Sequence, residues 1–217
     1  MEIKAIETDY NGYRFRSRLE ARWAVFFDAA KIQYEYEPEG FEIDDGERYL
    51  PDFYLPQYQL YIEIKPSSLD KDQRKIAEEK CRKFSVKIGK AIFISNGDPS
   101  EDFWGKLFAW DLCDSGGGTY EEYARFIPLG EYYYPDIVLF VFGGRLDRIV
   151  FVNDDYVKNK KVITEGMLLD YYPRDALSLL HANMNDLFDP QAKEGTFDYM
   201  RKQARQARFE HGEKPKV

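Results

Sequence analysis

Three charged residues in the first third of the chain have the types and spacing needed for metal-assisted hydrolysis. Asp52 follows a proline, and Glu63 and Lys65 stand eleven and thirteen positions later with Ile64 between them. Because strand side chains alternate between faces, Glu63 and Lys65 would share one face and Ile64 would enter the core. Two carboxylates and the backbone carbonyl of Ile64 form an oxygen donor set suited to Mg²⁺ or Mn²⁺. Lys65 would orient a water on that ion and balance the charge that builds during phosphodiester cleavage.

A Glu-x-Lys pair on one strand face is also common on solvated sheets, so the pair needs support from its surroundings. Apart from Glu63, residues 60–64 are apolar, which predicts an inner strand. Charged side chains are seldom buried in such a strand unless they are paired or functional. The gap between Asp52 and Glu63 fits a hairpin with its loop at residues 56–59, which would bring the two carboxylates together. These surroundings favour a catalytic cluster.

Hydrophobic spacing predicts the elements that must position this cluster. Apolar residues recur at helical spacing over residues 17–30, and Ser17 with Glu20 forms the S-x-x-E pattern of a capping box. Glu20 therefore has two interpretations: it reciprocates the Ser17 cap, or it directs a carboxylate from the helix at the metal cluster. Spacing alone favours the cap. Three strands are expected next, at residues 33–43, 48–55 and 60–65. Pro38-Glu39-Gly40 puts a bend in the first, and Pro51 confines the second to an edge or a strand end.

A charged helix follows the third strand, from Ser67 to about residue 86, and Gly89 ends it. Its expected buried stripe consists of Ile76, Ala77, Cys81 and Phe84. A short strand at 91–95 comes next. Because a helix between two strands implies a crossover connection, the sequence predicts an α/β protein with a mixed sheet flanked by helices.

The second half of the chain shows weaker patterns. Residues 104–112 are aromatic and apolar, and strands at 136–142 and 148–152 would form a hairpin around two glycines. Helices are expected at 175–187 and at 199–210, the latter basic. We therefore divide the chain into a core at residues 1–100 and a C-terminal α/β elaboration at residues 101–217.

Four segments in a fixed order resemble the PD-(D/E)XK nuclease superfamily, and small nucleases of bacteriophages and mobile elements in particular. They are Phe-Arg-Ser-Arg-Leu-Glu-Ala-Arg-Trp-Ala at 15–24, Tyr-Glu-Tyr-Glu-Pro at 34–38, Tyr-Leu-Pro-Asp-Phe at 49–53 and Ile-Glu-Ile-Lys at 62–65. The resemblance covers roughly residues 12–97. It implies a restriction-endonuclease-like fold in which Asp52 and Glu63 bind Mg²⁺, Lys65 is the catalytic lysine and Glu20 is the acid carried by the first helix.

One departure from that pattern bears on the mode of cleavage. Exonucleases of the superfamily often carry a Gln with a Tyr four residues later in the helix after the lysine strand, whereas here Gln73 is followed by Ala77. We therefore expect an endonuclease acting on DNA, with RNA as an open alternative. The rival hypothesis is a catalytically silent protein on the same scaffold that binds a host protein or mimics DNA.

Basic residues near the proposed cluster are candidates for contacts with nucleic-acid phosphates. They are Arg14, Arg16, Arg18 and Arg22 around the first helix, and Lys71 and Arg74 at the start of the second. A solvated helix face explains the four arginines equally well. For the basic residues between Arg201 and Arg208 a solvated face is the better interpretation.

Composition bounds these expectations. The net charge of -8 excludes nucleic-acid binding driven by overall charge, so local basic patches and bound cations must attract the substrate. The two cysteines show no C-x-x-C spacing, and no apolar run reaches the ~18–20 residues of a membrane span. Without an apolar signal core at the N-terminus, we expect a cytoplasmic protein. The oligomeric state, including a homodimer, is left open.

Overall fold

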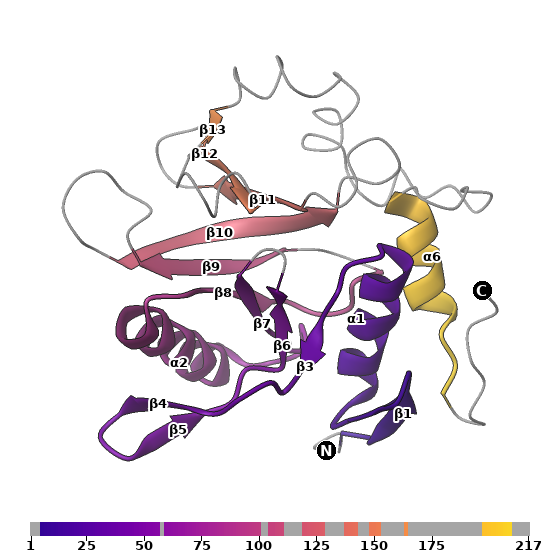
Figure 1. Ribbon diagram of the computed structural model, residues 1–217, viewed down its shortest axis with the longest axis horizontal. Coiled ribbons are helices and arrows are strands. Elements are labelled where there is room, and N and C mark those ends of the chain that lie inside the picture. The colour runs from indigo at the N-terminus through magenta and orange to yellow at the C-terminus, as the bar shows by residue number, and fades with distance from the viewer. Residues whose placement is uncertain are drawn as a thin grey trace.

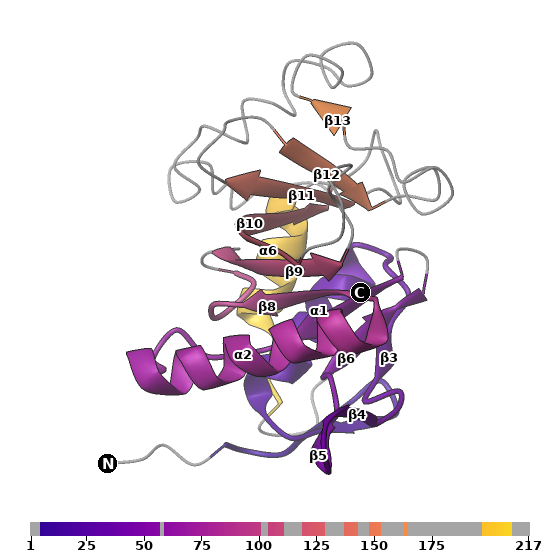
Figure 2. The same cartoon turned by 90° about the vertical axis from the view of Figure 1, so that its left-hand side faces the viewer.

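A computed structural model of the chain describes residues 5–56, 59–100, 104–110, 119–128, 137–142, 148–152, 163–164 and 197–209. A mixed sheet forms its centre, with helices on both faces (Figures 1 and 2). The α/β class and the mixed sheet predicted from the sequence are therefore confirmed. None of the helices in the described ranges is both long enough and apolar enough to cross a membrane.

The chain begins with a hairpin of β1 (Thr8–Tyr10) and β2 (Tyr13–Phe15), followed by α1 (Arg18–Ala29). Ser17 caps α1 as its pattern predicts, because its hydroxyl accepts a hydrogen bond from the Glu20 amide. The apolar face of α1 then packs into an aromatic core. The fully buried rings of this core include Phe15, Trp23, Phe26, Phe27 and Phe53.

The three strands expected between residues 33 and 65 form five shorter ones. β3 (Glu35–Tyr36), β6 (Phe53–Leu55) and β7 (Leu60–Glu63) join the main sheet, whereas β4 (Phe41–Asp44) and β5 (Glu47–Tyr49) form a separate hairpin. The interruption expected at Pro38 to Gly40 is more than a bend, because β3 and β4 on its two sides belong to different sheets. The prediction of one strand at 48–55 was wrong, because Pro51, which has no amide hydrogen to donate, separates β5 from β6.

The helix after β7 is α2 (Lys71–Ile88), and it connects β7 to the parallel strand β8 (Ala91–Ser95). Asp70 caps it, not Ser67, because the Asp70 carboxylate accepts from the amides of Asp72 and Gln73. Gly89 ends it in the left-handed conformation, as predicted. The expected buried stripe holds except for Ile76, whose side chain is 61% exposed.

The sheet continues through five more strands to the order β13-β12-β11-β10-β9-β8-β7-β6-β3 (Figure 2). The added strands are β9 (Trp104–Trp110), β10 (Thr119–Pro128), β11 (Ile137–Phe142), β12 (Arg148–Val152) and β13 (Ile163–Thr164). The predicted antiparallel pairing of the strands at 136–142 and 148–152 is confirmed by β11 and β12. The helix expected at 175–187 lies outside the described residues.

The last described helix, α6 (Phe197–Gln206), packs beside α1 on the face of the sheet opposite α2 (Figure 1). Arg201 on α6 is only 1% exposed, and its guanidinium donates to the Ser100 carbonyl at 3.1 Å. The expectation of a solvated basic face is therefore wrong for this arginine. Because β9 pairs with β8 and α6 packs on α1, the C-terminal elaboration is joined to the core both through the sheet and through a helix.

Candidate active site

The β6–β7 hairpin brings Asp52 and Glu63 together. Phe53 pairs with Ile62 in the antiparallel ladder, so Asp52, one residue before Phe53, lies across from Glu63, one residue after Ile62. The Ile64 amide donates to Asp52 Oδ2 at 2.7 Å, which fixes the Asp52 carboxylate at the end of β7. Both carboxylates are buried, with exposures of 5% for Asp52 and 6% for Glu63. β7 lies between β6 and β8, so the predicted inner strand is confirmed.

Lys65 completes the cluster from the residue beyond Ile64. Its ammonium Nζ is hydrogen-bonded to Glu63 Oε1 and donates to the Ile64 carbonyl at 3.3 Å. Its backbone amide donates to the Ser95 hydroxyl at 3.1 Å, which ties the end of β7 to β8. Glu63 and Lys65 therefore share one face, as the alternation predicts, while Ile64 is buried on the other.

Burial and the closeness of other charges shift the pKa values in the cluster. Burial raises the pKa of Asp52 well above its usual range, and the charge of the neighbouring Glu63 raises it further. Lys65 and the Ile64 amide lower this pKa, but their combined effect is smaller. For Lys65, burial is the largest influence and lowers the pKa. The charges of Glu63 and Asp52 outweigh burial, so the Lys65 pKa is raised and its ammonium is held charged.

A tyrosine that the sequence reasoning missed holds Glu63 in place. The Tyr49 hydroxyl, at the end of β5, donates to Glu63 Oε2 at 2.6 Å and lies 3.5 Å from the Cys81 sulfur on α2. All three side chains are buried. Tyr49 stands three residues before Asp52, so its closeness to the cluster in sequence was the one available signal.

The Glu20 carboxylate accepts hydrogen bonds from groups at and near the start of α1. Its Oε1 accepts from the Ser17 hydroxyl at 2.7 Å, and its Oε2 accepts from the Tyr36 hydroxyl at 2.6 Å and from the Arg16 amide at 3.1 Å. Glu20 thus stabilises the start of α1 as a capping box would, although its backbone donor is the Arg16 amide and not the amide of the N-cap residue Ser17. The Glu20 charge is nevertheless near enough to contribute to the raised pKa of Asp52. The catalytic role of Glu20 stays a prediction.

The six basic residues proposed for phosphate contacts lie in different places. Arg16 lines the site, 3.6 Å from Asp52 Oδ1, and is paired with Glu37. Arg14 is paired with Glu7 on the surface, and Arg22 with Asp98. Arg74 donates to the Ser95 carbonyl at 2.8 Å and so fastens α2 to the end of β8. Arg18 and Lys71 begin α1 and α2 and are not among the residues that line the site.

An open pocket of about 530 Å³ covers the cluster, between the chain around β5 and the first turns of α2. Its volume is sufficient for a phosphate group and a hydrated ion. Two further cations line it that the sequence reasoning missed, Arg48 and Lys80. Leu50 and Ile76, both exposed, form an apolar part of its wall. The pocket thus has two buried carboxylates and four basic side chains around one opening.

The donor set suits a hard divalent cation, although it is sparse. Across the ranges that the structure describes, no three His, Cys, Asp or Glu side chains gather as a ligand cluster. The carboxylates of Asp52 and Glu63 and the Ile64 carbonyl are nevertheless oxygen ligands of the kind Mg²⁺ takes, with water filling its remaining positions. The raised pKa of Asp52 shows that added positive charge would stabilise its ionised form.

Comparisons with family models, with curated proteins and with solved structures give no match to this chain. The residues of the site and the resemblance of its motifs are therefore the basis on which a function can be proposed.

Proposed function

We propose that this protein is a metal-dependent endonuclease of the PD-(D/E)XK kind, which hydrolyses phosphodiester bonds in DNA. The observation that carries the proposal is the convergence of Asp52, Glu63 and Lys65 at the base of one open pocket. Two buried carboxylates facing an ammonium in a solvent-accessible pocket are costly to keep without a function. The mixed sheet, with β6 and β7 antiparallel and β8 parallel after a helical crossover, is compatible with a restriction-endonuclease-like fold.

In this proposal Asp52, Glu63 and the Ile64 carbonyl hold Mg²⁺, or Mn²⁺ in its place. The ion would supply a bound water of lowered pKa and would withdraw charge from the phosphate. Since Lys65 lies on Glu63 and on the Ile64 carbonyl, its ammonium must shift toward the pocket when these oxygens bind a cation. There it would donate hydrogen bonds to the attacking water and neutralise the charge that develops on the phosphate.

The remaining basic residues of the pocket have a binding role in the proposal. Arg16, Arg48 and Lys80 line the opening and would contact the phosphate backbone on either side of the scissile bond. A protein with a net charge of -8 needs such a local concentration of cations to attract DNA. Arg16 would exchange its pairing with Glu37 for a phosphate oxygen.

The proposal is tested by incubating supercoiled plasmid with the protein and Mg²⁺, with EDTA as the blank. Wild type is expected to nick and linearise the plasmid, and Lys65→Ala to lower the rate by about 100-fold or more. Lys90→Ala is the matched control, because Lys90 is exposed and outside the pocket. Duplex, branched and single-stranded DNA and RNA substrates then define the substrate.

The opposite result would support the rival, a catalytically silent protein that binds a host protein. In that case, plasmid and all oligonucleotides survive with either metal, and Lys65→Ala behaves as wild type. Cleavage that Lys65→Ala and Lys90→Ala retain equally would also overturn the proposal, because the activity would then come from another site or another protein.

A further inference from the structure

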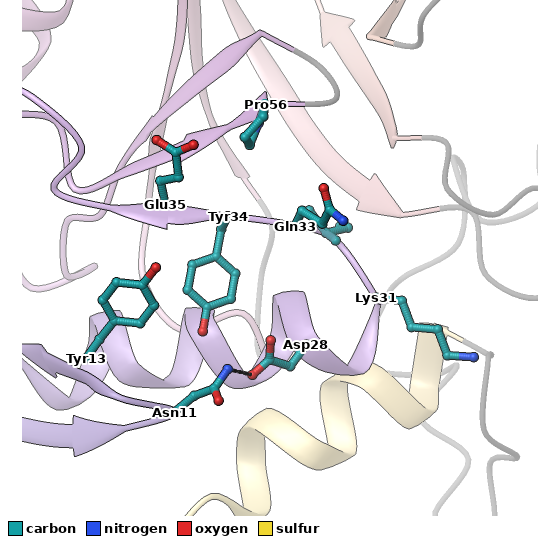
Figure 3. A pocket seen from close by; sticks show the side chains of 9 residues that line it. Asn11, Tyr13, Asp28, Lys31, Gln33, Tyr34, Glu35 and Pro56 are labelled. Atoms are coloured by element: carbon teal, nitrogen blue, oxygen red, sulfur yellow. Dashed lines mark hydrogen bonds between the residues drawn. The ribbon is translucent and has the colours of Figure 1, made fainter.

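A second pocket lies at the other end of α1, beside the tip of the β1–β2 hairpin (Figure 3). Its volume is about 520 Å³, and none of its lining residues lines the pocket over Asp52 and Glu63. The residues that define its chemistry are Asn11, Tyr13, Asp28 and Tyr34. Nothing in the proposed nuclease reaction uses this site.

Asp28 gives the pocket its negative charge. It lies in the last turn of α1, which contains no basic residue, so its carboxylate adds to the negative end of the helix dipole. Asp28 Oδ2 accepts a hydrogen bond from the Tyr10 hydroxyl at 2.8 Å and one from the Asn11 side-chain amide nitrogen, Nδ2, at 3.3 Å. Burial raises the pKa of Asp28 by more than these two hydrogen bonds lower it, so a cation beside Asp28 would stabilise the ionised carboxylate.

Two tyrosines form an aromatic wall next to this carboxylate. The Tyr13 and Tyr34 rings have their centroids 5.8 Å apart and are tilted by 40°, so they touch and form one wall, not the two sides of a cage. The Tyr13 ring is 36% exposed. The Tyr34 hydroxyl is buried next to the Asn11 side-chain amide, and among the described residues it makes no hydrogen bond of good geometry. Figure 3 shows both rings projecting into the space beside Asn11 and Asp28.

We infer that this pocket binds the guanidinium group of an arginine side chain or of a small guanidine. A guanidinium offers N–H donors along its edge for Asp28 and a flat cationic face for the tyrosine wall. Glu35 and Lys31 also line the pocket, but Figure 3 shows the Glu35 carboxylate and the Lys31 amine both directed away from Asp28 and the rings, so Asp28 supplies the charge beside the aromatic wall. A phosphate or carboxylate ligand would meet the Asp28 charge and the helix C-terminus, so the site selects cations over anions.

The test is an NMR titration of the full chain with N-acetyl-L-arginine amide at constant ionic strength. We expect saturable shifts of the Asn11, Asp28 and Tyr34 amides at millimolar ligand, and none with neutral N-acetyl-L-glutamine amide. Asp28→Asn keeps an acceptor for Tyr10 and Asn11 but removes the charge, and it should weaken binding about tenfold or more. Asp52→Asn, in the other pocket, is the matched control and should bind as wild type.

A second variant keeps the test decisive if Asp28→Asn does not fold. Tyr13→Leu removes an exposed ring of the wall and should weaken binding several-fold. Methylguanidine, titrated in parallel, distinguishes the sources: equal affinity indicates a free guanidine, and tighter binding of the arginine derivative indicates a protein side chain. Three results would overturn the inference. They are the absence of shifts, shifts spread over the whole surface, and shifts that both substituted proteins retain while folded.

Discussion

Replacing Tyr49 with phenylalanine tests whether one buried hydroxyl determines the position of Glu63. The hydroxyl donates to Glu63 Oε2 at 2.6 Å, and both side chains are nearly inaccessible to water. A hydrogen bond to a charged group contributes about 1.5–3 kcal/mol, and a buried carboxylate oxygen that loses its donor has no water to replace it. We therefore expect Tyr49→Phe to lower the free energy of unfolding by about 2 kcal/mol in metal-free protein.

The same substitution should weaken metal binding. Groups that hydrogen-bond to a metal-ligating carboxylate typically contribute 10–100-fold to metal affinity or activity, because they hold the ligand in its binding orientation. The Mg²⁺ concentration for half-maximal cleavage should therefore rise about 10–100-fold in Tyr49→Phe. Saturating Mg²⁺ should restore most of the rate, since the substitution leaves Asp52, Glu63 and Lys65 unchanged.

The measurements are urea unfolding in EDTA and plasmid nicking as a function of Mg²⁺ concentration. Tyr54→Phe is the matched control: Tyr54 stacks on Tyr61 from β6, and its hydroxyl makes no hydrogen bond within the described part of the chain. If Tyr49→Phe keeps the stability and the Mg²⁺ dependence of wild type, the hydrogen bond does not position Glu63. If only stability falls, Tyr49 belongs to the core and not to the site.

Three further predictions concern the charges and the backbone around the site. Burial and the Glu63 charge raise the pKa of Asp52, so the native state loses stability as pH rises from the ordinary Asp value of 3.8 through the native pKa. Asp52→Asn should therefore be more stable than wild type at pH 7 in EDTA, and its thermal unfolding should depend less on pH. Equal stability of the two proteins would contradict this prediction. Gly105→Ala would place a Cβ 2.2 Å from a backbone oxygen of β8 and should cost about 3 kcal/mol in urea unfolding, whereas Gly40→Ala meets no atom within 4 Å and should stay within about 0.5 kcal/mol. Glu20→Gln keeps a capping acceptor and should change stability by less than about 1 kcal/mol while slowing nicking about tenfold; an unchanged rate would leave Glu20 with its capping role alone.

Local patterns account for the parts of the fold that the sequence predicted well. Strand alternation placed Glu63 and Lys65 on one face, and a short hairpin was sufficient to bring Asp52 opposite Glu63. The α1 cap at Ser17 and the end of α2 at Gly89 likewise follow from residues within one helical turn. In each case the interacting groups are close in the chain, so backbone geometry alone fixes their relation.

The errors of the sequence reasoning have equally local causes. The bend expected at residues 38–40 is a full break and Pro51 divides the strand expected at 48–55, so β4 and β5 form a hairpin outside the main sheet. Ile76 has the residue type of a core position, but it is the neighbouring Ala77 that faces the sheet. Hydrophobicity therefore predicted the helix but not which of two adjacent apolar residues would be exposed.

The sequence by itself determined the first two helices, the inner strand between them and the three charged residues of the proposed site, because these depend on spacing along the chain. Only the tertiary structure decided that Tyr49 and Cys81 meet at Glu63, that Arg201 is buried against Ser100, and that a separate acidic pocket forms at the end of α1. These contacts join segments from different elements. Their geometry depends on how helices pack on the sheet, and no periodicity within either segment encodes that packing.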